Sequence, residues 1–160
     1  MQSQKIKNLF LRQSYIDSWN DYKKCLENSN STKWDYIILT ASNEEQKNNY
    51  SYQIETRLKD GYLPKKTHYA VIPDKDGMRV GSGGATFNVM KYIKDISGNE
   101  SFENKRILII HSGGDSKRVP QYSACGKLFS PVPRILPDGR TSTIFDEFMI
   151  AMSGVASRIH

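Results

Sequence analysis

The first thirty residues repeat apolar side chains every three to four positions, a spacing that predicts one amphipathic helix. Lysines and asparagines separate the apolar positions, which are Ile6, Leu9, Phe10, Ile16, Trp19 and Leu26. A polar stretch rich in asparagine and serine then predicts a loop. We interpret residues 1–32 as an N-terminal helical brace that carries no chemistry.

Three short apolar runs after the brace predict buried β-strands, at residues 34–41, 68–72 and 106–111. They are rich in β-branched and aromatic residues with few polar interruptions, which is typical of strands covered on both faces. Helical spacing returns after each run, and helices are expected from a Ser42–Glu45 capping box onward, over 85–96 and over 144–159. The expected buried positions of these helices are Tyr50, Ile54 and Leu58, then Phe87, Met90 and Ile93, and finally Phe145, Phe148, Met149 and Met152.

This alternation of strands and helices predicts βαβ units, and therefore an α/β fold with a parallel sheet covered on both faces. Ligands of such sheets bind outside the carboxyl ends of the strands. Two glycine-rich segments, residues 81–84 and 113–114, follow predicted strands. We therefore expect both of them at the binding edge of the sheet.

Length and charge narrow the range of functions. The 160 residues suit one domain, and 23 basic against 17 acidic residues give a net charge of +6. Residues 101–140 account for +4 of it, because they hold seven Lys or Arg and three Asp or Glu. This local excess suits an anionic ligand such as a nucleotide. Nucleic acid is the weaker candidate because no run of five basic residues is present.

Other features bear on the location of the protein. No apolar run is long enough to cross a bilayer, and the N-terminus lacks the apolar segment of a secretory signal. Cys25 and Cys125 cannot build a disulfide framework, and neither has the spacing of a metal site. We expect a reduced, cytoplasmic protein that is not associated with a membrane.

The strongest chemical signal follows the third predicted strand. Residues 111–120 read His-Ser-Gly-Gly-Asp-Ser-Lys-Arg-Val-Pro, and Gly126 and Lys127 come shortly after. Two glycines at a strand end let the backbone turn and present successive N–H groups to an anionic oxygen. Arg118 offers a planar fork for phosphate oxygens, and Lys127 a mobile positive charge. The segment is interpreted as a phosphate-binding loop, the alternative being a glycine turn with surface cations.

This pattern resembles the signature loop of sugar-phosphate nucleotidyltransferases. The fuller resemblance is to the fucose-1-phosphate guanylyltransferases, also called GDP-fucose pyrophosphorylases. Four blocks agree in order between residues 34 and 133, namely 34–42 with the adjoining Glu45-Gln46, 80–86, 109–120 and 126–133.

The resemblance implies a Rossmann-like, three-layer nucleotidyltransferase fold of the glycosyltransferase-A type with a mostly parallel sheet. Residues 33–160 would be its N-terminal portion, truncated before the domain ends and inactive alone. The implied reaction joins GTP and L-fucose 1-phosphate into GDP-L-fucose and pyrophosphate, with Mg²⁺ as cofactor. Some relatives fuse this domain to an L-fucokinase.

Site residues are carried over by position. The resemblance implies that Gly113, Gly114 and Ser116 cradle the triphosphate. Arg118 would hold the β- and γ-phosphates that leave, and Lys127 would neutralise the α-phosphate that is attacked. Because the sugar phosphate is itself the nucleophile, catalysis would consist of positioning and charge neutralisation.

The second glycine segment is implied to contact the nucleotide through Gly81, Gly83 and Gly84. On spacing alone, a tight structural turn is an equal alternative. Asp115 is assigned to the nucleotide site as well, although it could instead cap the loop. No metal ligand is identified, because enzymes of this type take their metal-binding aspartate from a later strand.

Rival interpretations remain open. Asp74 and Asp76 have the D-x-D spacing of metal-dependent glycosyltransferases, although a turn before Gly77 is favoured there. A non-catalytic nucleotide-binding module is a further alternative. His111 is interpreted as an interior histidine. Residues 121–128 fall short of a P-loop because they lack its first glycine and its Ser or Thr.

Overall fold

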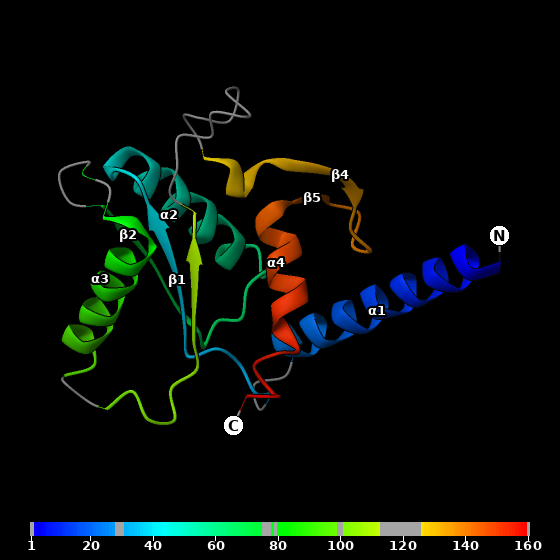
Figure 1. Cartoon of the computed structure of the whole chain (residues 1–160), viewed down its shortest axis with the longest axis horizontal. Helices are drawn as coiled ribbons and strands as arrows, with labels where there is room; N and C mark the ends of the chain where they lie inside the picture. The colour runs from blue at the N-terminus through cyan, green and yellow to red at the C-terminus, as the bar shows by residue number, and fades with distance from the viewer. Residues whose placement is uncertain are drawn as a thin grey trace.

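The computed structural model describes residues 2–27, 31–74, 78, 80–98, 101–112 and 126–159. In chain order (Figure 1) the elements are α1 (Gln2–Glu27), β1 (Tyr36–Ala41), α2 (Glu44–Lys59), β2 (His68–Pro73), α3 (Gly81–Ile96), β3 (Ile107–His111), the 3-10 turn η3 (Lys127–Phe129), β4 (Pro131–Ile135), β5 (Thr141–Thr143) and α4 (Ile144–Ser153). No helix in this described part combines the length and the apolar character needed to cross a bilayer.

The main sheet has three parallel strands in the order β2-β1-β3, so the first strand is the central one. Alternate residues of β1 face opposite ways: Ile37 and Leu39 join one apolar cluster, and Ile38 joins another. The first cluster includes residues of α2 and the second includes residues of α3, so helices cover both faces of the sheet. The predicted α/β architecture with a parallel sheet is confirmed.

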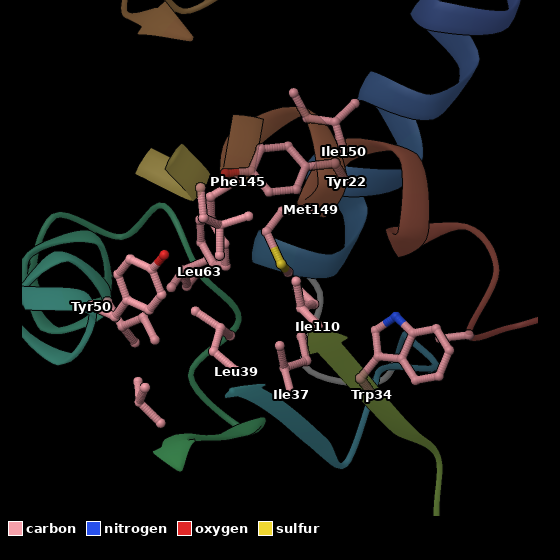
Figure 2. Close-up of a cluster of buried hydrophobic side chains, with 14 of the residues drawn as sticks. Tyr22, Trp34, Ile37, Leu39, Tyr50, Leu63, Ile110, Phe145, Met149 and Ile150 are labelled. Carbon is pink, nitrogen blue, oxygen red and sulfur yellow. The ribbon is translucent and has the colours of Figure 1, made fainter. Parts of the chain in front are cut away.

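The larger cluster fills the space between the sheet, α2 and α4. Figure 2 shows Tyr50 of α2, Phe145 and Met149 of α4 and Leu39 of the central strand in this cluster. Phe145 and Met149 are buried, as the spacing predicts, whereas Phe148 is 45% exposed. The last helix therefore turns only one side of its predicted apolar face toward the core.

The N-terminal helix is a brace over part of its length only. Tyr22 and Cys25 are buried in its second half, and the indole of Trp34 just beyond donates a 3.0 Å hydrogen bond to the Met152 carbonyl near the end of α4. The first half projects from the body (Figure 1) and leaves its apolar residues exposed, among them Ile6, Leu9 and Phe10, and Ile16 just beyond is 50% exposed. The predicted helix is confirmed, but its apolar stripe is exposed over the N-terminal half. Its partner α4 has 10 residues against the 26 of α1 and is too short to cover the stripe.

The start of α2 differs from the predicted capping box. Asn43, not Ser42, is the N-cap, and its side-chain oxygen accepts a 2.8 Å hydrogen bond from the Gln46 amide. The side chain that reaches back belongs to Gln46, whose Oε1 accepts from the Ser42 amide at 2.9 Å. An asparagine at this position satisfies the free helical amide as well as serine would, so the cap shifts by one residue.

The start of α3 also differs from prediction. The helix begins at Gly81 rather than near residue 85, so the glycine segment is its first turn and not a loop. Ala85, Val89 and Ile93 form the buried face, while Phe87 is 72% exposed. Phe87 lies two positions, or about 200°, from Ala85 and so points to the opposite side of the helix.

Strands β4 and β5 form a small antiparallel sheet that the sequence patterns did not predict. Pro131 and Pro133 interrupt the apolar alternation of β4, and prolines are tolerated there because β4 has only one partner among the described strands. The connection between the strands is a turn in which the Leu136 amide bonds to the Arg140 carbonyl at 2.8 Å.

Candidate functional site

The topology selects one edge of the sheet as the place for a ligand. The chain leaves β1 through α2 to reach β2, and then crosses back through α3 to reach β3 on the other side of β1. The connections therefore diverge at the carboxyl ends of β1 and β3. Such a switch point opens a crevice outside the strand ends, where doubly wound α/β proteins bind their ligands.

The predicted site residues fall into two groups. Lys127 and the three glycines of α3 lie within the described residues. The remaining predicted positions lie outside the described residues: they are Gly113, Gly114, Asp115, Ser116 and Arg118.

The predicted phosphate-binding loop leaves the sheet at Ser112, which is buried and fastened to β1. Its hydroxyl donates a short hydrogen bond to the Thr40 carbonyl, and its amide donates to the Thr40 side chain at 3.3 Å. Thr40 is the register partner of His111, the last residue of β3. The two neighbouring strand ends at the switch point are therefore tied together immediately before the loop begins.

The chain re-enters the described structure at Gly126, where only glycine fits. Its φ is +71°, in the left-handed region that other residues rarely adopt. A Cβ at this position would collide with the Tyr50 hydroxyl and lie 2.6 Å from the Tyr50 Cζ atom. Tyr50 comes from α2 and is fully buried. The backbone turn at Gly126, which precedes Lys127, therefore packs directly against the Tyr50 ring. We call this turn the re-entry corner.

Lys127 and Ser112 line one groove of about 300 Å³ that runs between β3 and α4. The other lining residues are mostly apolar, and include Leu108, Ile110, Ile144 and Phe148. Lys127 itself is exposed and makes no ion pair within the described part of the chain. An exposed ammonium group beside the strand ends can meet an anionic group placed there.

His111 is exposed at the end of β3, so the interior position expected for it is wrong. It ends a strand that has only one partner in the described sheet, at the edge where solvent reaches it. Its Nε2 lies 3.1 Å from the Thr86 hydroxyl, and that hydroxyl donates its own proton to the Ser82 carbonyl at 2.9 Å.

This contact joins the end of β3 to the first turns of α3. The N-cap position of α3 is Val80, and no side-chain hydrogen bond caps the helix there. Gly83 has open space where a side chain would be, while a Cβ on Gly84 would press on Val80. The partial positive charge of a helix N-terminus favours an anion.

One described carboxylate, that of Asp74, follows a strand at this edge. Asp74 follows β2, and its amide donates to the Ala41 carbonyl at 2.8 Å. Its D-x-D partner Asp76 lies outside the described residues. Within the described ranges, no group of three His, Cys, Asp or Glu side chains could hold a metal ion.

A buried ion pair lies next to the turn that carries Lys127, and the sequence patterns did not predict it. Arg57 of α2 binds both carboxylate oxygens of Asp146 in α4, at 3.0 and 3.2 Å, and the two side chains are 11% and 6% exposed. The Arg57 guanidinium also lies 4.9 Å from the centre of the Phe129 ring in η3. One arginine therefore links α2, α4 and the turn that carries Lys127.

The electrostatics of Asp146 follow from these contacts. Burial acts to raise the pKa of this carboxyl, but hydrogen bonds from Arg57 and Thr143 outweigh burial and lower the pKa below its usual value. Thr143 and Asp146 form the capping box of α4, a Thr-x-x-Asp pattern that is readable in the sequence. This pattern could have predicted from the sequence that α4 begins after Thr143.

The residues on both sides of the predicted loop lie in a stretch that matches a family model. Residues 99–160 match the family model of the fucose pyrophosphorylase domain. This fucose pyrophosphorylase segment begins before β3 and includes Ser112, Lys127, the β4–β5 hairpin and α4. It also includes the predicted loop residues that lie outside the described structure.

Similar proteins extend the likeness toward the N-terminus. A fucose-1-phosphate guanylyltransferase from Mus musculus is 37% identical over 100 residues, which are 62% of this chain and 17% of the relative. A bifunctional fucokinase/GDP-fucose pyrophosphorylase from Arabidopsis thaliana is 32% identical over 148 residues, covering 75% of this chain and 14% of the relative. The Homo sapiens guanylyltransferase is 37% identical over 100 residues, or 16% of its length. No solved structure matches.

The chain therefore spans about a sixth of the length of the relatives it matches. The resemblance predicted from the sequence is confirmed, with the fucose pyrophosphorylase segment as its most specific part.

Proposed function

We propose that this chain supplies the nucleotide-binding part of a fucose-1-phosphate guanylyltransferase. The reaction is GTP plus L-fucose 1-phosphate giving GDP-L-fucose and pyrophosphate. The observation that carries the proposal is the family match over residues 99–160, because the matched stretch contains both ends of the predicted phosphate-binding loop. These ends, Ser112 and Lys127, line one groove at the carboxyl edge of the sheet. We also propose that the sheet is the N-terminal part of a nucleotidyltransferase fold of the glycosyltransferase-A type.

The proposed phosphoryl transfer requires that the two substrates are aligned and that the negative charge of the phosphates is neutralised. An oxygen of the sugar phosphate forms a bond to the α-phosphorus of GTP, and the bond from that phosphorus to the bridging oxygen breaks as pyrophosphate leaves. Lys127 is the proposed partner of the α-phosphate, and Arg118 that of the departing phosphates. Backbone amides complete the binding of the triphosphate, from Gly113, Gly114 and Ser116 with Asp115, and from Gly81, Gly83 and Gly84 in the first turn of α3.

Mg²⁺ is the proposed cofactor. The described residues do not fit a metal site made by protein groups alone, since no cluster of three suitable side chains occurs among them. Protein-bound Mg²⁺ usually combines one or two carboxylates with substrate phosphates and water. We therefore propose that Mg²⁺ arrives with the triphosphate.

The test is nucleotide selectivity measured by isothermal titration with Mg²⁺ present. GTP should bind more tightly than ATP, CTP or UTP, and GDP-fucose should rank among the best ligands. Lys127→Ala should weaken GTP binding by about 10-fold or more, because a charged contact to phosphate is lost. The matched control is Lys94→Ala in the last turn of α3, which should leave binding unchanged. A preference for UTP, or equal binding of all four nucleotides, rejects the guanylyltransferase.

Turnover gives a second test. In the full-length enzyme, Arg118→Ala should lower kcat/KM for pyrophosphate release from GTP and fucose 1-phosphate by about 100-fold or more, which is a loss of a few kcal/mol of transition-state stabilisation. Activity that survives Arg118→Ala but requires Asp74 and Asp76 would instead indicate the D-x-D glycosyltransferase.

A further inference from the structure

The Tyr50 hydroxyl is a buried polar group with no hydrogen-bond partner among the described residues. Leaving such a group unpaired is unfavourable, and phenylalanine would fill the same volume without that cost. The hydroxyl is directed away from the helix axis of α2 toward the re-entry corner, where Gly126 packs against it. A buried tyrosine hydroxyl without a described partner points to a partner gained in another state of the protein.

Two described groups are placed to become that partner. Burial raises the pKa of Tyr50, while the Ser112 hydroxyl and the Leu128 backbone are near enough to lower it in part. Neither has the geometry of a hydrogen bond to the hydroxyl. Ser112 already donates its proton to the Thr40 carbonyl, so its oxygen is able to accept. The Leu128 amide, one residue after Lys127, is able to donate.

We propose that Tyr50 is a positioning residue for the phosphate site. When a phosphate-bearing ligand binds, its hydroxyl donates to Ser112 and accepts from the Leu128 amide, and so bridges the two ends of the loop. The bridge sets the distance between the end of β3 and the corner that carries Lys127. This inference rests on the proposed function, since it assigns Tyr50 to the same site.

The experiment compares Tyr50→Phe with the unaltered protein, using inorganic pyrophosphate and GTP with Mg²⁺ as ligands. Isothermal titration should show binding weakened by about 5- to 10-fold, the effect of one or two net hydrogen bonds. The urea midpoint should stay equal or rise, because an unpaired buried hydroxyl is removed from the free protein. In hydrogen exchange, saturating pyrophosphate should slow the Leu128 amide of the unaltered protein and have less effect in the variant.

Two tyrosines serve as controls. Tyr52 lies on the same helix but is 66% exposed, and Tyr69 has a buried hydroxyl without a described partner, near the amino end of the sheet. Tyr52→Phe and Tyr69→Phe should both bind pyrophosphate like the unaltered protein. Binding that is unchanged in Tyr50→Phe overturns the inference alone. A fall in binding together with a fall in the urea midpoint also overturns it, because core packing then explains both. An unaltered protein that binds neither ligand overturns the proposed function as well.

Discussion

Replacing Asp146 with alanine should remove a large part of the stability of this fold. The carboxylate accepts hydrogen bonds from Arg57 at 3.0 and 3.2 Å and from Thr143 at 3.0 Å from its amide and 2.7 Å from its hydroxyl. Removing one member of a buried ion pair costs about 3–5 kcal/mol, because the other charge stays buried without a partner. Losing the capping box costs about 1 kcal/mol more, but the same carboxylate makes both sets of contacts. We therefore expect a loss of about 4 kcal/mol.

This loss is large beside the roughly 5–15 kcal/mol that folds a typical domain. It corresponds to a drop in Tm of about 8–16 °C at this chain length. Urea denaturation followed by far-UV circular dichroism measures it, provided that the m-value is unchanged. The matched control is Lys47→Ala, which removes the exposed pair with Glu44 and should cost under about 0.5 kcal/mol.

The double variant Arg57→Met with Asp146→Leu separates the charge from the packing. Because apolar residues of similar volume replace both charges, most of the stability should return. A loss below about 1 kcal/mol in Asp146→Ala would refute the reasoning. So would a double variant that loses the sum of the two single losses, because the partners would then act independently.

Three further predictions rest on the same structure. The Asp146 pKa lies below its ordinary value of 3.8, so the stability due to the pair is complete at neutral pH and is lost as the pH falls below about 4. The urea midpoint of the unaltered protein should therefore fall in acid, and that of the double variant, which lacks this carboxyl, should fall less; equal falls would contradict the prediction. Gly126→Ala should cost about 2 kcal/mol or more in urea denaturation, because a Cβ meets Tyr50 and φ is +71°, and an alanine tolerated there would show that the corner is not tight. In urea denaturation, Asn43→Ala should lower the free energy of unfolding by about 1 kcal/mol, and Glu45→Ala should change it by less than about 0.5 kcal/mol. A larger loss in Glu45→Ala than in Asn43→Ala would instead support the capping box predicted from the sequence.

The strands of the main sheet were predictable because a buried parallel strand leaves an unbroken apolar run. All three runs became strands at nearly the expected positions. The side of each helix that faces the core was harder to predict from the spacing of apolar residues. Phe87 looked like a core residue, but the glycines before it extend α3 and the buried face is set by Ala85 and its neighbours at four-residue intervals.

The site was predictable only in outline. A strand followed by glycines marks the carboxyl edge of a sheet wherever it occurs, so Gly113, Gly114 and Lys127 could be expected at one place. The residues that pack around the candidate site make long-range contacts. Tyr50 meets Gly126 across 76 residues, and Arg57 meets Asp146 across 89 residues, and no local pattern records either pairing.

The packing of α1 against α4 has a consequence for how the protein is made. Cys25 of α1 contacts the Ser153 carbonyl, 128 positions later, and this sulfur is buried only once both helices are present. At about 5–20 residues per second, the ribosome needs roughly 6–25 seconds between releasing the two helices. During that interval Tyr22, Trp34 and the near face of the sheet are without their cover. The nascent chain should therefore depend on a chaperone most between the completion of β3 and the emergence of α4.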